Sequence, residues 1–471
     1  MNTDELAAAV YWAQHRVLEI QTKLHRWASD DPHRRFDDLY NLVTDPSFLL
    51  VAWDRVRNNK GARTAGVDGE TAYYIEVVRG LDGFLAELRK DLKARTFQPL
   101  PARRRAIPKA GGKVRYLGIA TIRDRVAQAS LKLVLEPIFE TDFLPCSYGF
   151  RPNRRAHDAV AEVHHFASRS YEWIVEGDIK ACFDEISHST LMARVRNRVG
   201  DKRVLTLVKA FLKAGILTED GTLAETDAGT PQGSILSPLL SNVALSVLDE
   251  HIAQGPGGPA ASPYERAKRR RQGLPNYRLV RHADDWCLLV TGTRGHADAL
   301  REELAGVLST MGLRLSPEKT LITHIDDDLV FLGWRIQRHR KRGTGKHYVY
   351  IYPAKKALVA VMDKVKTICR QSTNLPLEDL LHRLNRMLRG WTAYFKYGCS
   401  HATFSYLRSY LWKQVVRWQE RKHRRTPWKE LRRRYGIWPA NGGVELFDPA
   451  RVRAKRYYYR GTRIPPWPSI T

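Results

Sequence analysis

The sequence predicts an α+β fold, with helices at both ends of the chain and antiparallel strands in the middle. Three observations support this prediction. Apolar residues recur at helical spacing in the first 60 positions, short apolar strands flank acidic residues between positions 171 and 353, and three helical stripes follow position 354. At 471 residues, the chain is long enough for about three domains of ~150 residues each.

The chain is strongly basic. It contains 78 Lys and Arg against 50 Asp and Glu, a formal net charge of +28, and its 43% hydrophobic residues exclude wholesale disorder. Such an excess attracts polyanions, with nucleic acid as the first candidate and an anionic membrane as the second. No apolar run approaches the ~20 residues of a membrane span, so we expect no membrane partner.

Location and zinc content follow from two further features. The N-terminus carries Asp4 and Glu5 instead of a basic and apolar signal, which predicts a cytoplasmic protein. The five cysteines are scattered and form no Cys-x-x-Cys pair. We therefore expect no zinc site, and no zinc-bearing HNH endonuclease.

The N-terminal half is predicted to alternate helices with one hairpin. Residues 1–60 read as helices, and residues 123–140 place apolar side chains on one helical side. Between them, residues 98–118 are basic and interrupted by glycines, which is typical of a β-hairpin with a basic rim. Residues 255–273 are rich in Gly and Pro and are predicted to form a loop.

The C-terminal part is predicted to be a small helical bundle with a basic tail. Three apolar stripes lie between residues 354 and 423. Residues 424–471 carry 12 Lys and Arg against 3 Asp and Glu, interleaved with Trp and Tyr. Charge with aromatic rings favours a nucleic-acid platform, whereas a solvated surface helix would explain only the charge.

Three carboxylates stand out because they follow or interrupt apolar strands. Asp178 ends a strand at residues 173–175, and Asp284 and Asp285 lie between two apolar runs. Neighbours in a regular strand face opposite sides, so the pair can share a metal site only at a tight hairpin tip. Oxygen ligands of this kind suit Mg²⁺. Taken alone, an Asp-Asp pair is more typical of a turn or a helix cap.

The surrounding motifs carry a resemblance. Residues 178–184 (DIKACFD), 229–238 (GTPQGSILSP) and 283–285 (ADD) occur in this order. With them the chain resembles a reverse transcriptase, and more narrowly a group II intron-encoded reverse transcriptase/maturase of the lineage without an HNH domain. Further matches extend over residues 100 to 400, at Ile107–Lys109, Arg115–Ile119, Ser147–Pro152, Gly312–Leu313, Glu318–Thr320, Phe331–Gly333 and Leu388–Trp391.

The resemblance implies a right-hand polymerase fold. Residues 1–60 would be a helical extension of the fingers, 61–170 the fingers and 171–353 the palm with its antiparallel sheet. Residues 354–423 would be the helical thumb, or maturase domain, and 424–471 a basic DNA-binding segment. Its exposed contacts would come from Arg424, Arg425, Arg432, Arg433 and Arg434.

The resemblance also implies roles for individual residues. Asp178, Asp284 and Asp285 would be the catalytic Mg²⁺ ligands, and Lys109 and Arg115 would hold the incoming triphosphate, although Lys113 and Arg103–Arg105 are alternatives. Phe183 would be a ribose gate that selects deoxynucleotides, or else a residue that packs in the core. Gln232 would lie near template and primer, or else mark an ordinary loop-to-helix start. Lys319 would be a proton donor to pyrophosphate, or else an exposed lysine without a specific role.

Two positions depart from the family pattern. His282 stands where a Tyr usually precedes the Ala-Asp-Asp motif, which affects the geometry expected at the primer end. Tyr116 replaces the Pro that usually follows the arginine.

The predicted function is an RNA-directed DNA polymerase that also binds group II intron RNA to promote splicing and intron mobility. RNA template, DNA primer or target, and deoxynucleoside triphosphates would be its partners. Three alternatives remain: a splicing maturase that does not use polymerase activity, a domesticated enzyme of defence or repair, and an RNA-making polymerase, which Phe183 disfavours.

Overall fold

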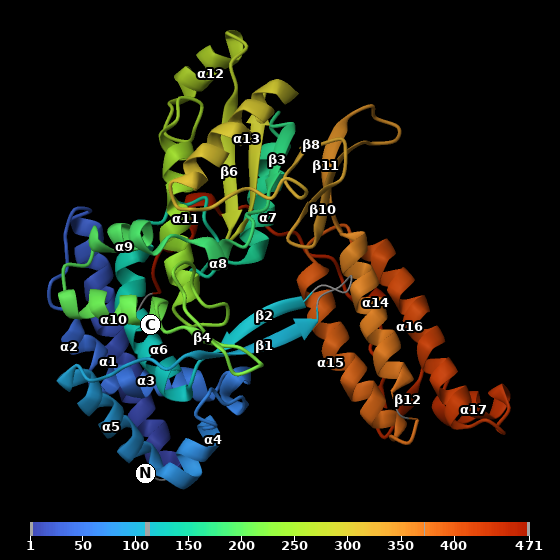
Figure 1. Cartoon of the computed structure of the whole chain (residues 1–471). Helices are drawn as coiled ribbons and strands as arrows, with labels where there is room; N and C mark the ends of the chain where they lie inside the picture. Colours follow the sequence, from blue (N-terminus) through green and yellow to red (C-terminus); the bar gives the residue numbers. More distant parts are fainter. Residues whose placement is uncertain (1–2, 109–113, 372, 469–471) are drawn as a thin grey trace.

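The computed structural model describes residues 3–108, 114–371 and 373–468 (Figure 1). Lys109 and Lys113 fall outside these residues. An N-terminal group of helices lies at the base of the view, a central sheet lies above it, and a C-terminal helical bundle lies to one side. No helix in the described ranges is both long and apolar enough to cross a membrane. All five cysteines are free.

The N-terminal helices form around α6, whose residues are buried on nearly every side. Short polar caps define the helix starts: Asp45 accepts the backbone N–H of Ser47, and Thr121 accepts that of Asp124. The predicted helices of residues 1–60 and 123–140 are confirmed. The helices of this region are α1 (Thr3–Asp30), α2 (Tyr40–Val43), α3 (Pro46–Arg57), α4 (Ala72–Tyr74), α5 (Leu81–Ala94) and α6 (Ile122–Glu140).

The predicted basic hairpin is present and projects toward the C-terminal bundle (Figure 1). Strands β1 (Ala102–Pro108) and β2 (Val114–Ile119) pair antiparallel, with Arg103 opposite Ile119. A second, shorter hairpin, β4 (Ile216–Leu217) and β5 (Leu223–Ala224), extends this sheet in the order β2-β1-β4-β5.

The central sheet has the order β6-β7-β3-β8, and every pairing in it is antiparallel. Its strands are β3 (Trp173–Gly177), β6 (Asn276–His282), β7 (Asp285–Thr291) and β8 (Leu321–His324). Leu288 and Val290 pack on one face with helices α11 (Ser237–Gln254) and α13 (Arg294–Ser309). Cys287 and Leu289 pack on the other face with α7 (Ala156–Ala167). Because both faces are buried, β7 is an unbroken apolar run.

The remaining elements of this part connect the sheet to its surroundings. The predicted loop at residues 255–273 is wrong in part, because it contains helix α12 (Pro263–Arg271). A capping box between Ser262 and Glu265 starts that helix, a signal that the Gly and Pro content conceals. Three further helices follow β3 along the chain: α8 (Cys182–Glu185), α9 (His188–Arg196) and α10 (Lys202–Leu212).

The C-terminal bundle has its own hydrophobic core, in which Leu381, Leu384 and Leu411 are fully buried. Its helices match the three predicted stripes. A small sheet precedes them, and a short helix with a small hairpin follows them. These elements are β9 (Leu329–Phe331), β10 (Trp334–Arg340), β11 (His347–Pro353), α14 (Lys355–Arg370), α15 (Leu377–Phe395), α16 (His401–Lys422), α17 (Trp428–Tyr435), β12 (Ala440–Asn441) and β13 (Val444–Glu445).

After this hairpin the chain returns to the central sheet and ends beside the N-terminal helices (Figure 1). The Tyr457 hydroxyl donates to Asp158 at 3.0 Å, and the Arg460 guanidinium donates to the same carboxylate at 2.7 Å. Trp467 stacks on His25 of α1. Tyr457 and Trp467 of the basic tail therefore contribute to packing, whereas Trp428 and Tyr458 are exposed.

Candidate active site

The acidic pair lies at a tight hairpin tip, as the spacing predicts. His282 pairs with Asp285 across β6 and β7, which leaves a turn of only two residues, Ala283 and Asp284. Ala283 adopts a left-handed conformation with φ of 59°, and this conformation reverses the chain direction. Asp284 therefore lies in the turn itself and Asp285 begins the outgoing strand.

Asp178 reaches the same edge through strand register. Gly177 is the last paired residue of β3 and lies opposite Trp286, so the next residue, Asp178, lies beside Asp285. The approach is close: a side chain at Gly177 would place its Cβ 2.0 Å from the Trp286 ring. Only glycine allows the indole to lie there, and the indole fixes the position where β3 ends.

The three carboxylates differ in their partners. The ammonium group of Lys319 contacts both oxygens of Asp178, at 3.1 and 3.0 Å. The Asp284 and Asp285 side chains make no hydrogen bond or ion pair with any residue that the structure describes. The pKa of Asp285 is raised to about 6, first by burial and then by the negative charges of Asp284 and Asp178. The nearby charge of Lys319 opposes this rise only in part, so the two neighbouring carboxylates lack a direct partner among the described residues.

These carboxylates fit a divalent cation chemically. The donors are all oxygens, and their mutual repulsion is the feature that a dication removes. Across residues 3–108, 114–371 and 373–468, no three His, Cys, Asp or Glu side chains surround a single metal position. Asp178 contacts Lys319 instead. The donor set is present, and Asp178, Asp284 and Asp285 are the residues that would hold such an ion.

A buried arginine beneath the hairpin tip was not singled out from the sequence. Arg281 and Asp249 are both fully buried and are joined by bonds of 2.8 and 2.6 Å. The same guanidinium donates to Asn242 at 2.9 Å and to the Ala283 carbonyl at 3.1 Å. It therefore supports the strained turn directly. An arginine within a β-strand and an aspartate within an apolar helical run were the available signals.

A second polar chain connects the basic hairpin to the acidic strand end. The Arg115 Nε donates to the Gln232 side-chain oxygen, and the Gln232 amide donates to Asp184, each at 2.9 Å. The backbone N–H of Gly118 also donates to the Gln232 carbonyl at 2.7 Å. Phe183 lies next to Asp184 and is half-buried, so its ring is partly available. Asp184 was not predicted as a site residue.

His282 is the position that departs from the family pattern. Its ring lies 6.5 Å from that of Phe150, measured between centroids. Burial lowers the pKa of His282 below its ordinary value, so the imidazole is neutral at pH 7. In charge, it therefore resembles the aromatic side chain that it replaces.

The five arginines predicted to bind nucleic acid are all exposed, at Arg424, Arg425, Arg432, Arg433 and Arg434. Three of them occupy the last turn of α17, where cations are favourable beside the carboxyl end of a helix. Leu431 and Tyr435 attach that helix to the core of the C-terminal bundle. This arrangement leaves the guanidinium groups facing solvent.

Comparisons with known proteins agree with this geometry. Residues 107–336 match the family described as reverse transcriptase (RNA-dependent DNA polymerase), and residues 358–436 match the group II intron, maturase-specific domain. The first match implies a right-hand polymerase fold.

Two curated relatives cover much of the chain. Protein YkfC of Escherichia coli (strain K12) is 37% identical over 374 residues, which are 74% of this chain and 97% of that protein. Group II intron-encoded protein LtrA of Lactococcus lactis subsp. cremoris is 34% identical over 379 residues, 70% of this chain and 61% of LtrA. Together with the two domain matches, these similarities show that the chain belongs to the group II intron-encoded RNA-directed DNA polymerases with a maturase domain.

Proposed function

We propose that the chain extends a DNA primer along an RNA template with Asp178, Asp284 and Asp285 as its catalytic carboxylates. The observation that carries this proposal is the hairpin tip, where two adjacent carboxylates of a chain of net charge +28 make no ion pair with any described residue. Mg²⁺ bound there would activate the primer 3′-hydroxyl and stabilise the leaving pyrophosphate. The division into fingers, palm and thumb at the predicted boundaries belongs to the same proposal.

The basic hairpin would hold the incoming nucleotide. Arg115 is exposed and is oriented by Gln232, so its guanidinium is positioned to bind phosphate oxygens. Asp184 orients the Gln232 amide in turn, and we infer that it acts as a positioning residue. Phe183 would face the ribose and exclude a 2′-hydroxyl. Lys109 would join Arg115 on the triphosphate.

Lys319 would serve two purposes in turn. Its contact with Asp178 balances one carboxylate while the metal is absent. With a cation held by the aspartates, the Lys319 ammonium group would be available to donate a proton to the leaving pyrophosphate. Replacing Lys319 with Gln should slow a single turnover more than it weakens nucleotide binding.

Primer extension tests the central proposal. Wild type with Mg²⁺, an RNA template and a DNA primer should incorporate deoxynucleotides and not ribonucleotides. The Asp284→Ala/Asp285→Ala double variant should extend nothing and still bind the template. If well-folded wild type binds RNA tightly and extends nothing, the polymerase proposal fails and a splicing factor without synthesis replaces it.

The maturase role would use the basic surface of the C-terminal bundle. We propose that the five exposed arginines contact phosphates of the intron RNA or of the target DNA. Replacing all five with Gln should flatten the dependence of log affinity on log salt by about 0.7–0.9 per lost phosphate contact. An unchanged salt slope would place the nucleic acid elsewhere. Splicing of an intron RNA encoded around this gene distinguishes a maturase from a domesticated polymerase.

A further inference from the structure

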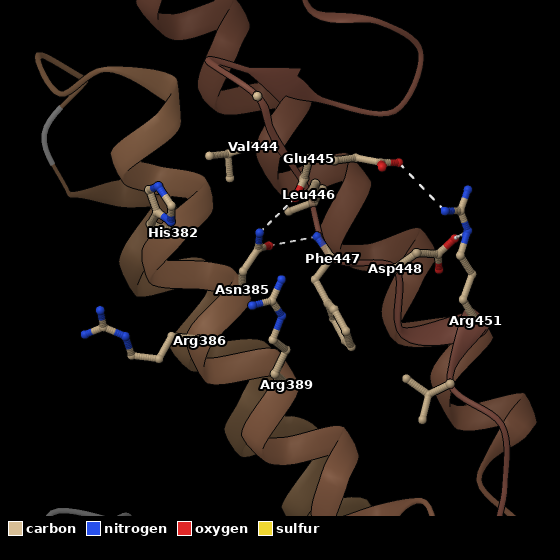
Figure 2. Close-up of a pocket in the computed structure, with 12 residues that line it drawn as sticks. His382, Asn385, Arg386, Arg389, Val444, Glu445, Leu446, Phe447, Asp448 and Arg451 are labelled. Carbon is tan, nitrogen blue, oxygen red and sulfur yellow. Dashed lines mark hydrogen bonds and ion pairs between the residues drawn. The ribbon is translucent and has the colours of Figure 1, made fainter.

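A basic groove lies between α15 and the chain that follows the last hairpin (Figure 2). Its volume is about 800 Å³, within the range of pockets that take a nucleotide-sized ligand. One wall is α15, with His382, Arg386 and Arg389, and the other is formed by residues 443–452. The spacing of four and then three places these side chains on one helical face.

Two of these cations have no compensating charge. Neither the Arg386 nor the Arg389 guanidinium makes a hydrogen bond or ion pair in the described part of the chain. Both are exposed. The acidic residues of the groove pair with other arginines: Asp448 with Arg408 at 3.0 Å and with Arg451 at 3.6 Å. The groove therefore presents two free guanidinium groups.

An aromatic ring lies beside one of them. The guanidinium carbon of Arg389 is 6.0 Å from the centre of the Phe447 ring, and the ring is half-buried. Figure 2 shows Arg389 and Phe447 side by side at the centre of the groove. An aromatic ring and an arginine together are the usual means of holding an unstacked base and its phosphate.

A buried amide holds the backbone segment that carries the Phe447 ring. The Asn385 side chain is 4% exposed and bonds the backbone on both sides of Leu446. Its amide donates to the Glu445 carbonyl at 2.8 Å, and its oxygen accepts the Phe447 N–H at 2.7 Å. Both bonds are drawn in Figure 2. The position of Phe447 is thus fixed before any ligand binds, which lowers the entropic cost of binding.

We propose that this groove binds a single unpaired nucleotide of an RNA strand, with the base on Phe447 and its phosphate on Arg389 and Arg386. Glu445 is exposed at the rim, where one carboxylate oxygen lies 4.0 Å from Arg451, and it offers an acceptor to the ribose 2′-hydroxyl, a donor that DNA lacks. The maturase-domain match ends at residue 436, so it does not cover the wall that carries Phe447. The proposal rests on the proposed RNA-binding function and adds the site and the form of RNA bound.

Binding of three hairpins to the full chain tests this proposal. The first is an RNA hairpin with one bulged 2-aminopurine nucleotide, the second is the same hairpin without the bulge, and the third is the bulged hairpin made of DNA. Wild type should bind the bulged RNA about tenfold more tightly than either control, the effect of one stacked base. The 2-aminopurine fluorescence should fall on binding, because the base stacks.

Variants locate the effect. Phe447→Leu keeps an apolar side chain and Arg389→Gln keeps a polar one, and each should abolish the preference for the bulge. Arg383→Gln is the matched control, since Arg383 is on the same helix but bonds Gln371 at 2.7 Å, and it should retain the preference. Thermal melting confirms that each variant is folded.

Three outcomes would overturn the proposal: equal binding of bulged and unbulged RNA by wild type, a preference that survives both groove variants, or equal binding of bulged DNA. Primer extension by wild type on a simple homopolymer template is measured in parallel. Its failure would count against the proposed polymerase and not against the groove.

Discussion

Two pairs of carboxylates differ in whether an arginine neutralises them: Asp249 and Glu140 on helices α11 and α6, and Asp284 and Asp285 at the tip of the β6–β7 hairpin. Asp249 and Glu140 are buried, and each is bonded by two nitrogens of one arginine, Arg281 and Arg151 respectively. Asp284 and Asp285, at the hairpin tip above Arg281, have no such partner within the described ranges. Arginine neutralises both of the buried acids, whereas the two acids at the hairpin tip have no arginine partner among the described residues. The difference teaches that burial inside the fold comes with a paired cation, and that the hairpin tip departs from this rule.

Neutralising the unpaired set should give the largest effect on activity. The isosteric change Asp284→Asn removes a charge that the proposed metal requires, so we expect single-turnover primer extension to fall at least about a thousandfold. Stability should be unchanged or slightly higher, because one repulsion with Asp285 is lost. Asp327→Asn, an exposed change on the turn between β8 and β9, is the control. A variant that keeps activity within tenfold would remove Asp284 from the catalytic set.

Neutralising the paired set should instead affect stability. Asp249→Asn leaves the buried Arg281 guanidinium without its ionic partner, which is expected to cost about 3–5 kcal/mol of unfolding free energy. Denaturant unfolding measures this cost. The Asp249→Leu/Arg281→Met variant removes both charges and should recover much of the loss. If Asp249→Asn costs less than about 1 kcal/mol, the pair does not hold the hairpin.

Glu162 lies between the two sets, because it is buried but bonded by the hydroxyl of Tyr148 and not by an arginine. Burial raises the pKa of Glu162 to about 7. The folded state therefore retains a proton that the unfolded state, with a pKa near 4.5, releases. This contribution to stability is complete below pH 4.5 and is lost as the pH rises through 7.

We therefore expect wild type to lose about 1–3 kcal/mol more than Glu162→Gln between pH 5 and pH 8. Denaturant unfolding of both proteins at the two pH values gives the difference. Equal losses of unfolding free energy in the two proteins would show that Glu162 ionises with its ordinary pKa. Tyrosine hydroxyls would then stabilise a buried, charged carboxylate as well as an arginine does.

The smallest expected effect is on the choice between deoxynucleotides and ribonucleotides at the proposed catalytic site. Phe183→Ala removes the ring that we propose excludes the ribose 2′-hydroxyl, and it should reduce the preference for deoxynucleotides over ribonucleotides by about tenfold. The ratio of kcat/KM for the two nucleotides is the measurement. Phe183→Tyr keeps the ring and should keep the ratio. Unchanged selectivity in Phe183→Ala would assign the ring to packing alone.

Much of the fold follows from local patterns that the sequence displays. The helical stripes after residue 354, the basic hairpin at residues 102–119 and the strands around Asp284 were all predictable, because amphipathic periodicity and turn residues act locally. The tight tip was also predictable, because adjacent strand residues share a site only there. Helix α12 was missed because its cap lies within a Gly and Pro-rich segment.

The sequence by itself determined most of the elements, the excess of positive charge and the three aspartates that we propose as catalytic. Only the tertiary structure decided which charges would be compensated. The contacts between Asp249 and Arg281, Asp178 and Lys319, and Asp158 and Arg460 join residues 32, 141 and 302 positions apart. Local propensity carries no information about such pairs. They form because packing brings distant segments together, and burial then makes an unpaired charge costly. The raised pKa of Asp285 shows that the hairpin tip bears the same cost.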